Sequence, residues 1–375
     1  MTETKLIKLS KSCIDDADLE SVCAVLKEEY LGMGSWVKNF ENEIKSFLVT
    51  SNEVVCVNTG TAALHLALEA VTNLGDEVLV PTITYVASFQ AITAAGCVPV
   101  ACDVNPIDGL ICIKDAESKI TEKTTVIMPV HYAGNVSNMD NVYHLANTNG
   151  LRVIEDAAHS FGSRHVSQTM VGDTGDIICF SFDGIKNLTS GEGGAIVSSD
   201  KKLISSVQNN RLLGVKKDSE NRYQGKRSWD FEVEDQGYRY HMSNIMAAIG
   251  LSQLAKFTVN AKKRQNIAIY YQSKLSGITG VTTVPMDYEF VVPHIFPLKV
   301  KKRDQLKIYL GEKNIESGIH YKPNHLLHKF NSREIFSGAD AFYAETITLP
   351  LHPDIGVKNV DFIVDSIKEF YKLYG

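Results

Sequence analysis

Thr59, Gly60 and Thr61 stand where an apolar, β-branched run (54–59) gives way to a run of good helix formers (61–71). Backbone N–H groups at the start of a helix point out of it, and the helix dipole favours an anion there. A glycine lets a phosphate approach the backbone, and a threonine hydroxyl adds a donor. The triplet is therefore a candidate phosphate cup, although it also fits a tight turn in which Thr61 caps the helix.

Asp156 and His159 form a second candidate site. Asp156 ends the apolar run LRVIED, and open α/β sheets bind ligands outside the carboxyl ends of their strands. If the segment DAAHS turns into a helix, the two side chains share one face. Each residue also has a structural interpretation: Asp156 as a helix cap or solvated strand end, and His159 as a hydrogen-bonded core imidazole.

Lys186 is the third candidate, between a strand-like run (176–182) and the glycine-rich turn SGEGG (190–194). Its neighbours are small or apolar, apart from Asp183. Most lysines lie in solvent. A desolvated lysine, however, loses its proton more readily and becomes a nucleophile that can form a Schiff base.

Pyridoxal 5'-phosphate is a cofactor that needs all three features. It requires a phosphate cup, a lysine amine for the Schiff base, and a carboxylate that keeps the pyridine nitrogen protonated so that the ring accepts electrons. The chain supplies them in the order cup, Asp156, Lys186. Ser181 could give the phosphate another hydroxyl, and Tyr85, after an apolar run, could lay its ring on the pyridine face.

The elements that must position these residues alternate in type. Strand patterns cover 54–59, 77–84, 97–104, 124–132 and 151–156, and helix patterns cover 61–71, 85–96 and 138–150. This alternation predicts an α/β fold with a parallel sheet flanked by helices. The runs DIICFSF (176–182) and GAIVSS (194–199) predict a strand pair around SGEGG, so the sheet carries one antiparallel member.

The pattern changes beyond Gly250. A lysine-rich helical stretch over 251–275 predicts a connector helix, and 281–375 mix strands and helices as a smaller α+β domain does. We predict an N-terminal arm and large cofactor-binding domain over 1–255, and the connector helix with a small C-terminal domain over 256–375. The polar, charged residues 214–236 predict a long exposed loop.

Composition excludes several classes of protein. A chain of 375 residues that is 44% apolar can bury a large core, and its net charge of −6 offers no general attraction for nucleic acid. No apolar run approaches the ~20 residues that span a bilayer, and the N-terminus lacks an apolar stretch of signal-peptide length. The sequence predicts a soluble, cytoplasmic protein that binds neither membrane nor nucleic acid.

The cysteines and histidines do not predict a metal site. The seven cysteines are scattered and none forms a Cys-x-x-Cys pair, which favours reduced thiols over a disulfide framework or zinc. His320, Tyr321, His325 and His328 lie close in sequence. No carboxylate or cysteine accompanies them at ligand spacing, and Pro323 disfavours a regular helix before residue 325.

From about residue 20 to its C-terminus, the chain resembles the DegT/DnrJ/EryC1/StrS sugar aminotransferases, which are fold-type-I pyridoxal phosphate enzymes. The matching stretches are NTGTAALHLALEA, GDEVLVPTITYVAS, VIEDAAHSFGS, GDIICFSFDGIKNLTSGEGGAIV, GYRYHMSNIMAAIGLSQL and IHYKPNH. A single piece such as SGEGG is a weak signal, whereas the shared order and spacing of all of them is specific.

The resemblance implies a large domain around a mixed seven-stranded sheet, a smaller C-terminal domain, and a homodimer with shared active sites. Lys186 would form the Schiff base and, once displaced, move the proton between the amino-bearing carbon and the cofactor. Asp156 would pair with the pyridine nitrogen, His159 would face the ring or its 3-hydroxyl, and Tyr85 would stack on the ring. The positions that match the family's phosphate contacts are Gly60, Thr61 and Ser181.

One position departs from the family pattern. Many members read Gly-Tyr-Asn-Tyr-Arg-Met where this chain reads GYRYHM (237–242), and in the family that asparagine reaches the neighbouring subunit's cofactor phosphate. Arg239 could make the same contact with a full charge and a forked donor, or reach a sugar-linked phosphate. The alternative is an ion pair with Glu232 or Asp235.

The family's loop that corresponds to His320 and Tyr321 lies by the active site, which makes both residues candidate substrate contacts. The implied function is transfer of an amino group from L-glutamate to a nucleotide-linked 4-keto-6-deoxy sugar. A dTDP sugar aminated at C4 is favoured, with amination at C3 as the close alternative.

Three rival functions follow from the same fold or motifs. Related dehydratases carry a histidine in place of the reactive lysine, and Lys186 counts against them. A non-catalytic regulator with this fold is a second alternative. A nicotinamide dehydrogenase is disfavoured because GMG (32–34) is not continued to a third glycine.

Overall fold

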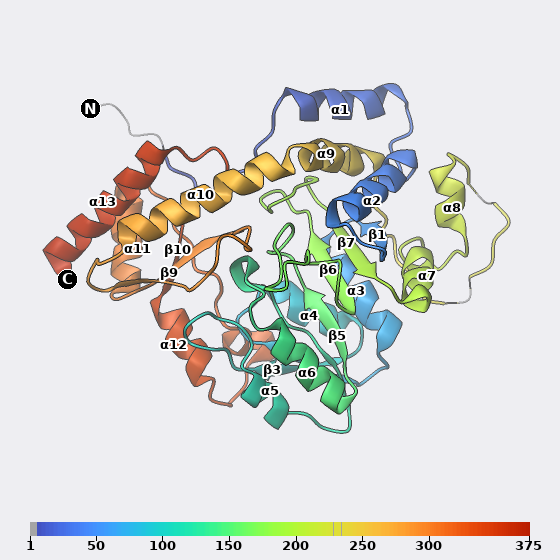
Figure 1. The fold of residues 1–375 in the computed structure, drawn as a ribbon. Coiled ribbons are helices and arrows are strands. Elements are labelled where there is room, and N and C mark those ends of the chain that lie inside the picture. Colours follow the sequence, from blue (N-terminus) through green and yellow to red (C-terminus); the bar gives the residue numbers. More distant parts are fainter. Residues whose placement is uncertain (1–5, 228, 234) are drawn as a thin grey trace.

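A seven-stranded sheet forms the centre of the computed structural model, which describes residues 6–227, 229–233 and 235–375 (Figure 1). Its spatial order is β1-β7-β6-β5-β4-β2-β3. The strands are β1 (Glu53–Val57), β2 (Glu77–Pro81), β3 (Val98–Cys102), β4 (Thr124–Ile127), β5 (Arg152–Asp156), β6 (Ile177–Ser181) and β7 (Gly194–Ser198). Strand β7 is antiparallel to both neighbours and the other pairs are parallel. The predicted mixed α/β sheet is confirmed.

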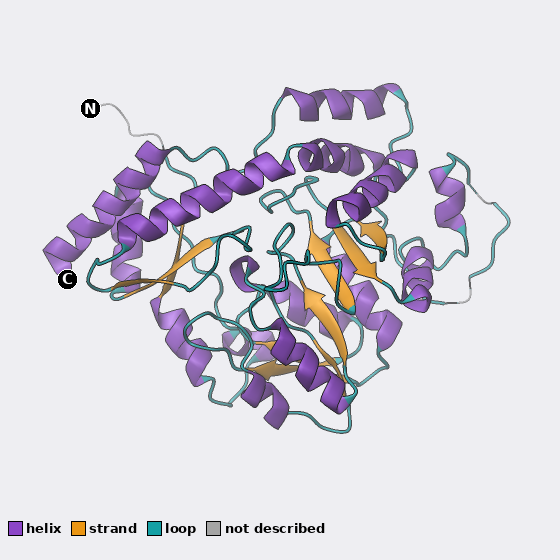
Figure 2. Cartoon of the chain, viewed as in Figure 1, coloured by secondary structure: helices purple, strands orange, loops and turns teal. Residues whose placement is uncertain are grey.

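Helices cover both faces of this sheet (Figure 2). One face carries α3 (Gly60–Val71), α4 (Val86–Ala94) and α7 (Lys201–Asn210). The other carries α2 (Ser35–Leu48), α5 (Ile113–Ser118), α6 (Met139–Asn149) and α9 (Asn244–Ala255). Helix α6 ends at Gly150, as predicted, in a left-handed conformation (φ 68°) that suits glycine.

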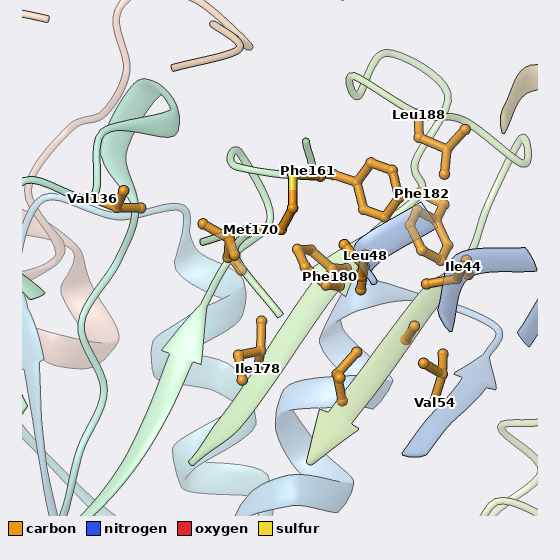
Figure 3. Packing of buried hydrophobic residues seen from close by; sticks show 14 of the residues in the cluster. Ile44, Leu48, Val54, Val136, Phe161, Met170, Ile178, Phe180, Phe182 and Leu188 are labelled. Carbon is orange, nitrogen blue, oxygen red and sulfur yellow. The ribbon is translucent and has the colours of Figure 1, made fainter. Parts of the chain in front are cut away.

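The strands are apolar at nearly every position because both of their faces are buried. In β6, Ile177 and Cys179 join the cluster under α3, whereas Ile178 and Phe180 join the cluster under α2. Figure 3 shows part of the second cluster, where Phe180 lies near Leu48 of α2. Successive side chains of a strand point to opposite faces, so neighbouring residues of β6 pack in different clusters.

The C-terminal part builds a second sheet of three antiparallel strands in the order β10-β9-β8. Its strands are β8 (Val281–Thr283), β9 (Phe296–Val300) and β10 (Thr346–Leu349), and its helices are α10 (Phe257–Leu275), α11 (Arg303–Glu312), α12 (Ser337–Glu345) and α13 (Val357–Tyr374). A separate apolar cluster joins α10, α11 and α13 to this sheet. The domain boundary after residue 255 stays a prediction.

The connector helix predicted over 251–275 is interrupted at Lys256. Helix α9 ends at Ala255 and α10 begins at Phe257, with Lys256 between them at φ −106° and ψ 7°. The Lys256 ammonium binds the carboxylates of Asp15 and Asp18, each at 2.6 Å. The lysine-rich sequence pattern does not reveal this break, because the carboxylates that bind Lys256 belong to the N-terminal segment.

The segment 214–236 was predicted to be an exposed loop, and this is wrong for its first part. It contains α8 (Asp218–Tyr223), whose residues Asp218 and Ser219 are buried. Arg211, which is fully buried, donates hydrogen bonds to Glu41 (2.8 Å) and to the Ser219 hydroxyl (3.3 Å). From residue 224 onward the described residues of the segment are exposed, apart from 228 and 234, which lie outside the description.

The remaining elements are short or peripheral: α1 (Asp16–Lys27), and the 3-10 turns η1 (Tyr132–Gly134), η2 (Asn324–Leu326) and η3 (His328–Phe330). Within the described part of the chain, none of the helices combines the length and the apolar character that crossing a membrane requires.

Candidate active site

A cavity of about 490 Å³ lies where the parallel strands end, and it gathers nearly all of the predicted site residues. Strands β5 and β6 end at Asp156 and Ser181, and both residues line the cavity. The predicted residues in its wall are Gly60, Thr61, Tyr85, Asp156, His159, Ser181, Lys186, His320 and Tyr321. Arg239 does not line it.

The candidate phosphate cup is the N-terminus of α3. Thr59 caps this helix, because its hydroxyl oxygen accepts a hydrogen bond from the Ala62 N–H at 3.0 Å. The cap is therefore Thr59 and not Thr61. A Cβ atom built on Gly60 would lie 2.7 Å from the Cβ of Ser181. Only glycine fits at this position. The first N–H groups of the helix, which have no intrahelical acceptor, therefore lie next to the Ser181 hydroxyl.

Asp156 is held by two donors. Its Oδ2 accepts a hydrogen bond from the Ser88 hydroxyl at 2.7 Å, and its Oδ1 accepts one from the Ala158 N–H at 3.3 Å. Ser88 is completely buried, and its hydroxyl lies 2.8 Å from that of Thr84. Sequence reasoning missed Ser88, whose one signal is a serine on the apolar side of a helical run.

His159 is a neutral ring with a defined tautomer. Its Nδ1 accepts a hydrogen bond from the Ala133 N–H at 3.2 Å, so the hydrogen sits on Nε2 and is donated to the Tyr321 hydroxyl at 2.9 Å. Burial and the neighbouring Lys186 hold the pKa of His159 well below its usual range. The residues after Asp156 form turns, so the conditional expectation of a shared helical face is not met.

Lys186 reaches into the cavity from the connection between β6 and β7. Burial lowers the pKa of its amine from the ordinary value of 10.5, although the carboxylates of Asp156 and Asp183 act in the opposite direction and raise it. Its Nζ lies 3.4 Å from Nε2 of His294. Sequence reasoning missed His294, which lies in a run interpreted only as a strand and precedes β9.

Tyr85, His320 and Tyr321 line the same cavity. Tyr85 is 59% exposed, and its ring centroid is 5.8 Å from that of Tyr321. Nδ1 of His320 lies 2.9 Å from the Thr348 hydroxyl, and burial lowers the pKa of His320 to about 4. Burial also raises the pKa of the Tyr321 phenol. His320 and Tyr321 therefore face a ligand as neutral groups.

Arg239 lies outside the cavity of its own chain. The alternating side chains of Tyr238 and Tyr240 belong to the cluster under α3, where the Tyr238 hydroxyl donates to Glu69 at 2.5 Å. Arg239 is exposed and lines a smaller cavity of about 170 Å³. Within the described residues it forms no ion pair with Glu232 or Asp235. A contact with a neighbouring subunit stays a prediction.

The two further histidines lie elsewhere. His325 contacts the Thr82 hydroxyl at 2.9 Å and stacks on Phe336, and His328 begins η3. Among the described residues, no group of three or more His, Cys, Asp or Glu side chains is placed to hold a metal ion.

The residues of the cavity fit pyridoxal 5'-phosphate. A glycine-lined helix N-terminus with a hydroxyl suits the phosphate, and a carboxylate held by two donors suits a protonated ring nitrogen. An amine whose pKa is lowered suits a bond to an aldehyde. The three lie in one cavity wall, although they come from segments far apart in the chain.

Comparison with known proteins agrees with this chemistry. A model described as the DegT/DnrJ/EryC1/StrS aminotransferase family matches residues 12–368. GDP-perosamine synthase of Escherichia coli O157:H7 is 34% identical, over 90% of this chain and 91% of that protein. The UDP-4-amino-4-deoxy-L-arabinose–oxoglutarate aminotransferase of Shewanella sediminis is 30% identical, over 97% and 98%.

The fold is shared with solved structures of such enzymes. The PLP form of Spr1654 from Streptococcus pneumoniae, assigned as a sugar aminotransferase, superposes with a TM-score of 0.90 at 28% identity. The match covers 98% of this chain and 99% of that one.

Proposed function

This chain belongs to the DegT/DnrJ/EryC1/StrS aminotransferase family, and we propose that it moves an amino group from L-glutamate to C4 of a nucleotide-linked 4-keto-6-deoxy sugar. It is an aminotransferase that uses pyridoxal 5'-phosphate, and its relatives act on nucleotide sugars. The observation that carries the proposal is the convergence of Gly60, Asp156 and Lys186 on one cavity.

Each of these residues has a distinct task. The N–H groups at Gly60 and Thr61 would hold the phosphate, together with the Ser181 hydroxyl. Asp156 would pair with the ring nitrogen and keep it protonated, because a buried carboxylate favours a cation beside it. When bound, pyridoxal phosphate supplies an electron sink for the carbon whose amine is exchanged.

Lys186 has two roles, one after the other. As a free amine it would be the nucleophile toward the cofactor aldehyde, whose oxygen would leave as water, and its lowered pKa favours the free amine. Once displaced by the incoming amine, Nζ would be the base that moves the proton between the amino-bearing carbon and the cofactor. Because donor and acceptor sugar use the same cavity in turn, a single lysine serves both halves of the reaction.

The choice of substrate rests on the names of relatives and on family resemblance. One relative's name contains a 4-amino sugar and oxoglutarate, the keto acid that glutamate leaves behind. The relatives' names carry UDP and GDP, and dTDP remains our proposal for this chain. We further propose a homodimer, in which Arg239 serves the neighbouring site, and a cytoplasmic enzyme, since all seven cysteines are free thiols.

The test compares Lys186→Ala with Lys201→Ala, which removes an exposed lysine at the start of α7. Borohydride reduction followed by peptide mass analysis should fix the cofactor on residue 186 in the native protein and in Lys201→Ala, and on no residue in Lys186→Ala. Oxoglutarate release from glutamate should follow the same pattern. Full activity of Lys186→Ala would overturn the proposed role.

The substrate is tested with a panel of dTDP, UDP and GDP keto-sugars. Proton NMR of the product shows whether nitrogen is added at C4 or C3. Amination of only 3-keto sugars would replace the C4 assignment while leaving the mechanism intact.

A further inference from the structure

His294 is the one imidazole within hydrogen-bond distance of the Lys186 amine in the described cavity wall, with Nε2 at 3.4 Å from Nζ. Its side chain is 4% exposed, and its ring centroid lies 4.4 Å from that of His159. None of the tasks assigned to the cofactor site uses it. The ring is thus a buried polar group placed against the reactive amine.

The position of His294 is fixed from two sides. Its carbonyl oxygen accepts a hydrogen bond from the Arg264 guanidinium at 3.3 Å, and that guanidinium also donates to the Leu351 carbonyl at 3.2 Å. On the other side, the amide of Asn187, next to the lysine, donates to the Val292 carbonyl at 2.8 Å. These bonds hold the backbone at residues 292 and 294 beside the segment that carries Lys186, so the His294 ring is presented to the Lys186 amine.

The ring presents its lone pair to the amine. Burial, together with the neighbouring Lys186, holds the pKa of His294 well below its usual range, so the ring is neutral. An ammonium group has hydrogens and no lone pair. Toward protonated Lys186, Nε2 must therefore be the acceptor, and the ring hydrogen sits on Nδ1, which has no hydrogen-bond partner within the described chain.

We propose that His294 receives the Lys186 amine whenever that amine is released from the cofactor, and that Nε2 accepts a hydrogen bond from it while it carries the substrate proton. This rests on the proposed function. The proton stays on Nζ, the ring keeps its own hydrogen on Nδ1, and no bond other than the hydrogen bond forms.

A neutral acceptor suits this task better than a carboxylate. A charged ammonium in a partly buried cavity needs a partner. A carboxylate at hydrogen-bond distance would hold the proton too firmly, since opposite charges at close range strongly favour the charged form. A neutral imidazole stabilises the ammonium less than a carboxylate would, so Nζ can release the proton again.

The test compares two variants that lack an acceptor, His294→Leu and His294→Phe, with His294→Gln, whose side-chain oxygen can reach the position of Nε2. Phenylalanine keeps a ring against His159. The matched control is His352→Leu, because His352 is also a buried histidine whose Nδ1 has no partner within the described residues, and it lies outside the cavity.

The first readout uses protein stripped of cofactor. Brief acetylation at a series of pH values, followed by peptide mass analysis, gives the midpoint for modification of Lys186. The charged or titratable groups that face this pair are Asp156, Asp183, His159, His320 and Arg264, and all are unchanged in the variants. Without the acceptor the ammonium form of Lys186 is less stable, so the midpoint should move to lower pH in His294→Leu and His294→Phe. The His294→Gln variant and the His352→Leu control should keep the native midpoint.

The second readout is a single turnover with glutamate deuterated at its α-carbon. We expect the rate to fall about tenfold or more in Leu and Phe, with a larger isotope effect, as for loss of a hydrogen bond to a charged group. Gln should recover most of the rate. If either acceptor-free variant folds and keeps both the native midpoint and the native isotope effect, the proposal is overturned. Absence of borohydride fixation on native Lys186 would instead overturn the proposed function.

Discussion

The Ser88 hydroxyl donates a hydrogen bond to Asp156 Oδ2 at 2.7 Å, and both side chains are buried. The carboxylate that we propose binds the ring nitrogen is thus oriented by a residue of α4, which belongs to a different strand-helix unit. This relationship makes the cofactor site sensitive to a side chain that does not touch the cofactor.

Replacement of this hydroxyl should weaken cofactor binding without abolishing it. Ser88→Ala removes one of the two donors to a buried carboxylate, and we expect the Kd for pyridoxal phosphate to rise about tenfold, the effect of one hydrogen bond to a charged group. Titration of apoprotein by visible absorbance measures it. Ser118→Ala, an exposed serine on α5, is the control. An unchanged Kd for Ser88→Ala would show that Asp156 needs no orienting donor.

Removal of the carboxylate itself should have a larger effect. Asp156→Ala leaves the protonated ring nitrogen without a counter-charge, so we expect weak cofactor retention and turnover lower by on the order of 100-fold or more. Steady-state rates at saturating cofactor separate the two effects. Turnover near that of the native enzyme would exclude the role given to Asp156.

The phosphate cup predicts a difference between two forms of the cofactor. In Gly60→Ala the new Cβ would lie 2.7 Å from the Ser181 Cβ, which displaces the hydroxyl and narrows the cup. Affinity for pyridoxal phosphate should fall more than affinity for pyridoxal, which has no phosphate. Gly311→Ala provides the control, because its Cβ would meet nothing within 4 Å. Equal losses for both ligands would argue against a phosphate at Gly60.

The reactivity of Lys186 should depend on pH in a defined direction. Only the free amine bonds the aldehyde, so the rate of cofactor attachment rises through the pKa of Lys186 and then levels off. Burial places that pKa below 10.5, whereas the carboxylate of Asp183 raises it. Asp183→Asn should therefore move the midpoint to lower pH, and Asp365→Asn, 73% exposed on α13, should not. A shift to higher pH in Asp183→Asn would contradict this assignment.

Mixed dimers test whether Arg239 acts across a subunit boundary. Lys186→Ala and Arg239→Ala should each be impaired as homodimers. A hybrid of the two has one site with the lysine of one chain and the arginine of the other, which is a complete native site. Co-refolding should thus restore activity. If mixing restores nothing although hybrids form, Arg239 serves the site of its own chain or none.

Most residues of the candidate site could be predicted from the sequence, because they stand at positions that a local pattern marks. Asp156 ends an apolar strand, Gly60 begins a helix, and Lys186 lies before a glycine-rich turn. Ser88 and His294 lack such a signal, since each acquires its role only through contacts between segments that the fold brings together. The break at Lys256 escaped prediction for the same reason: the carboxylates that bind this residue belong to the N-terminal segment.

The antiparallel strand β7 has a consequence for selectivity. Ser181 pairs with Gly194, and the Phe182 N–H donates a hydrogen bond to the Gly193 carbonyl at 2.8 Å. The connection that carries Lys186 is therefore anchored at both of its ends to paired strands of the sheet. Nζ of Lys186 can therefore move only as far as the lysine side chain allows. Selectivity between nucleotide sugars would then depend on the other residues around the cavity rather than on the placement of this nitrogen.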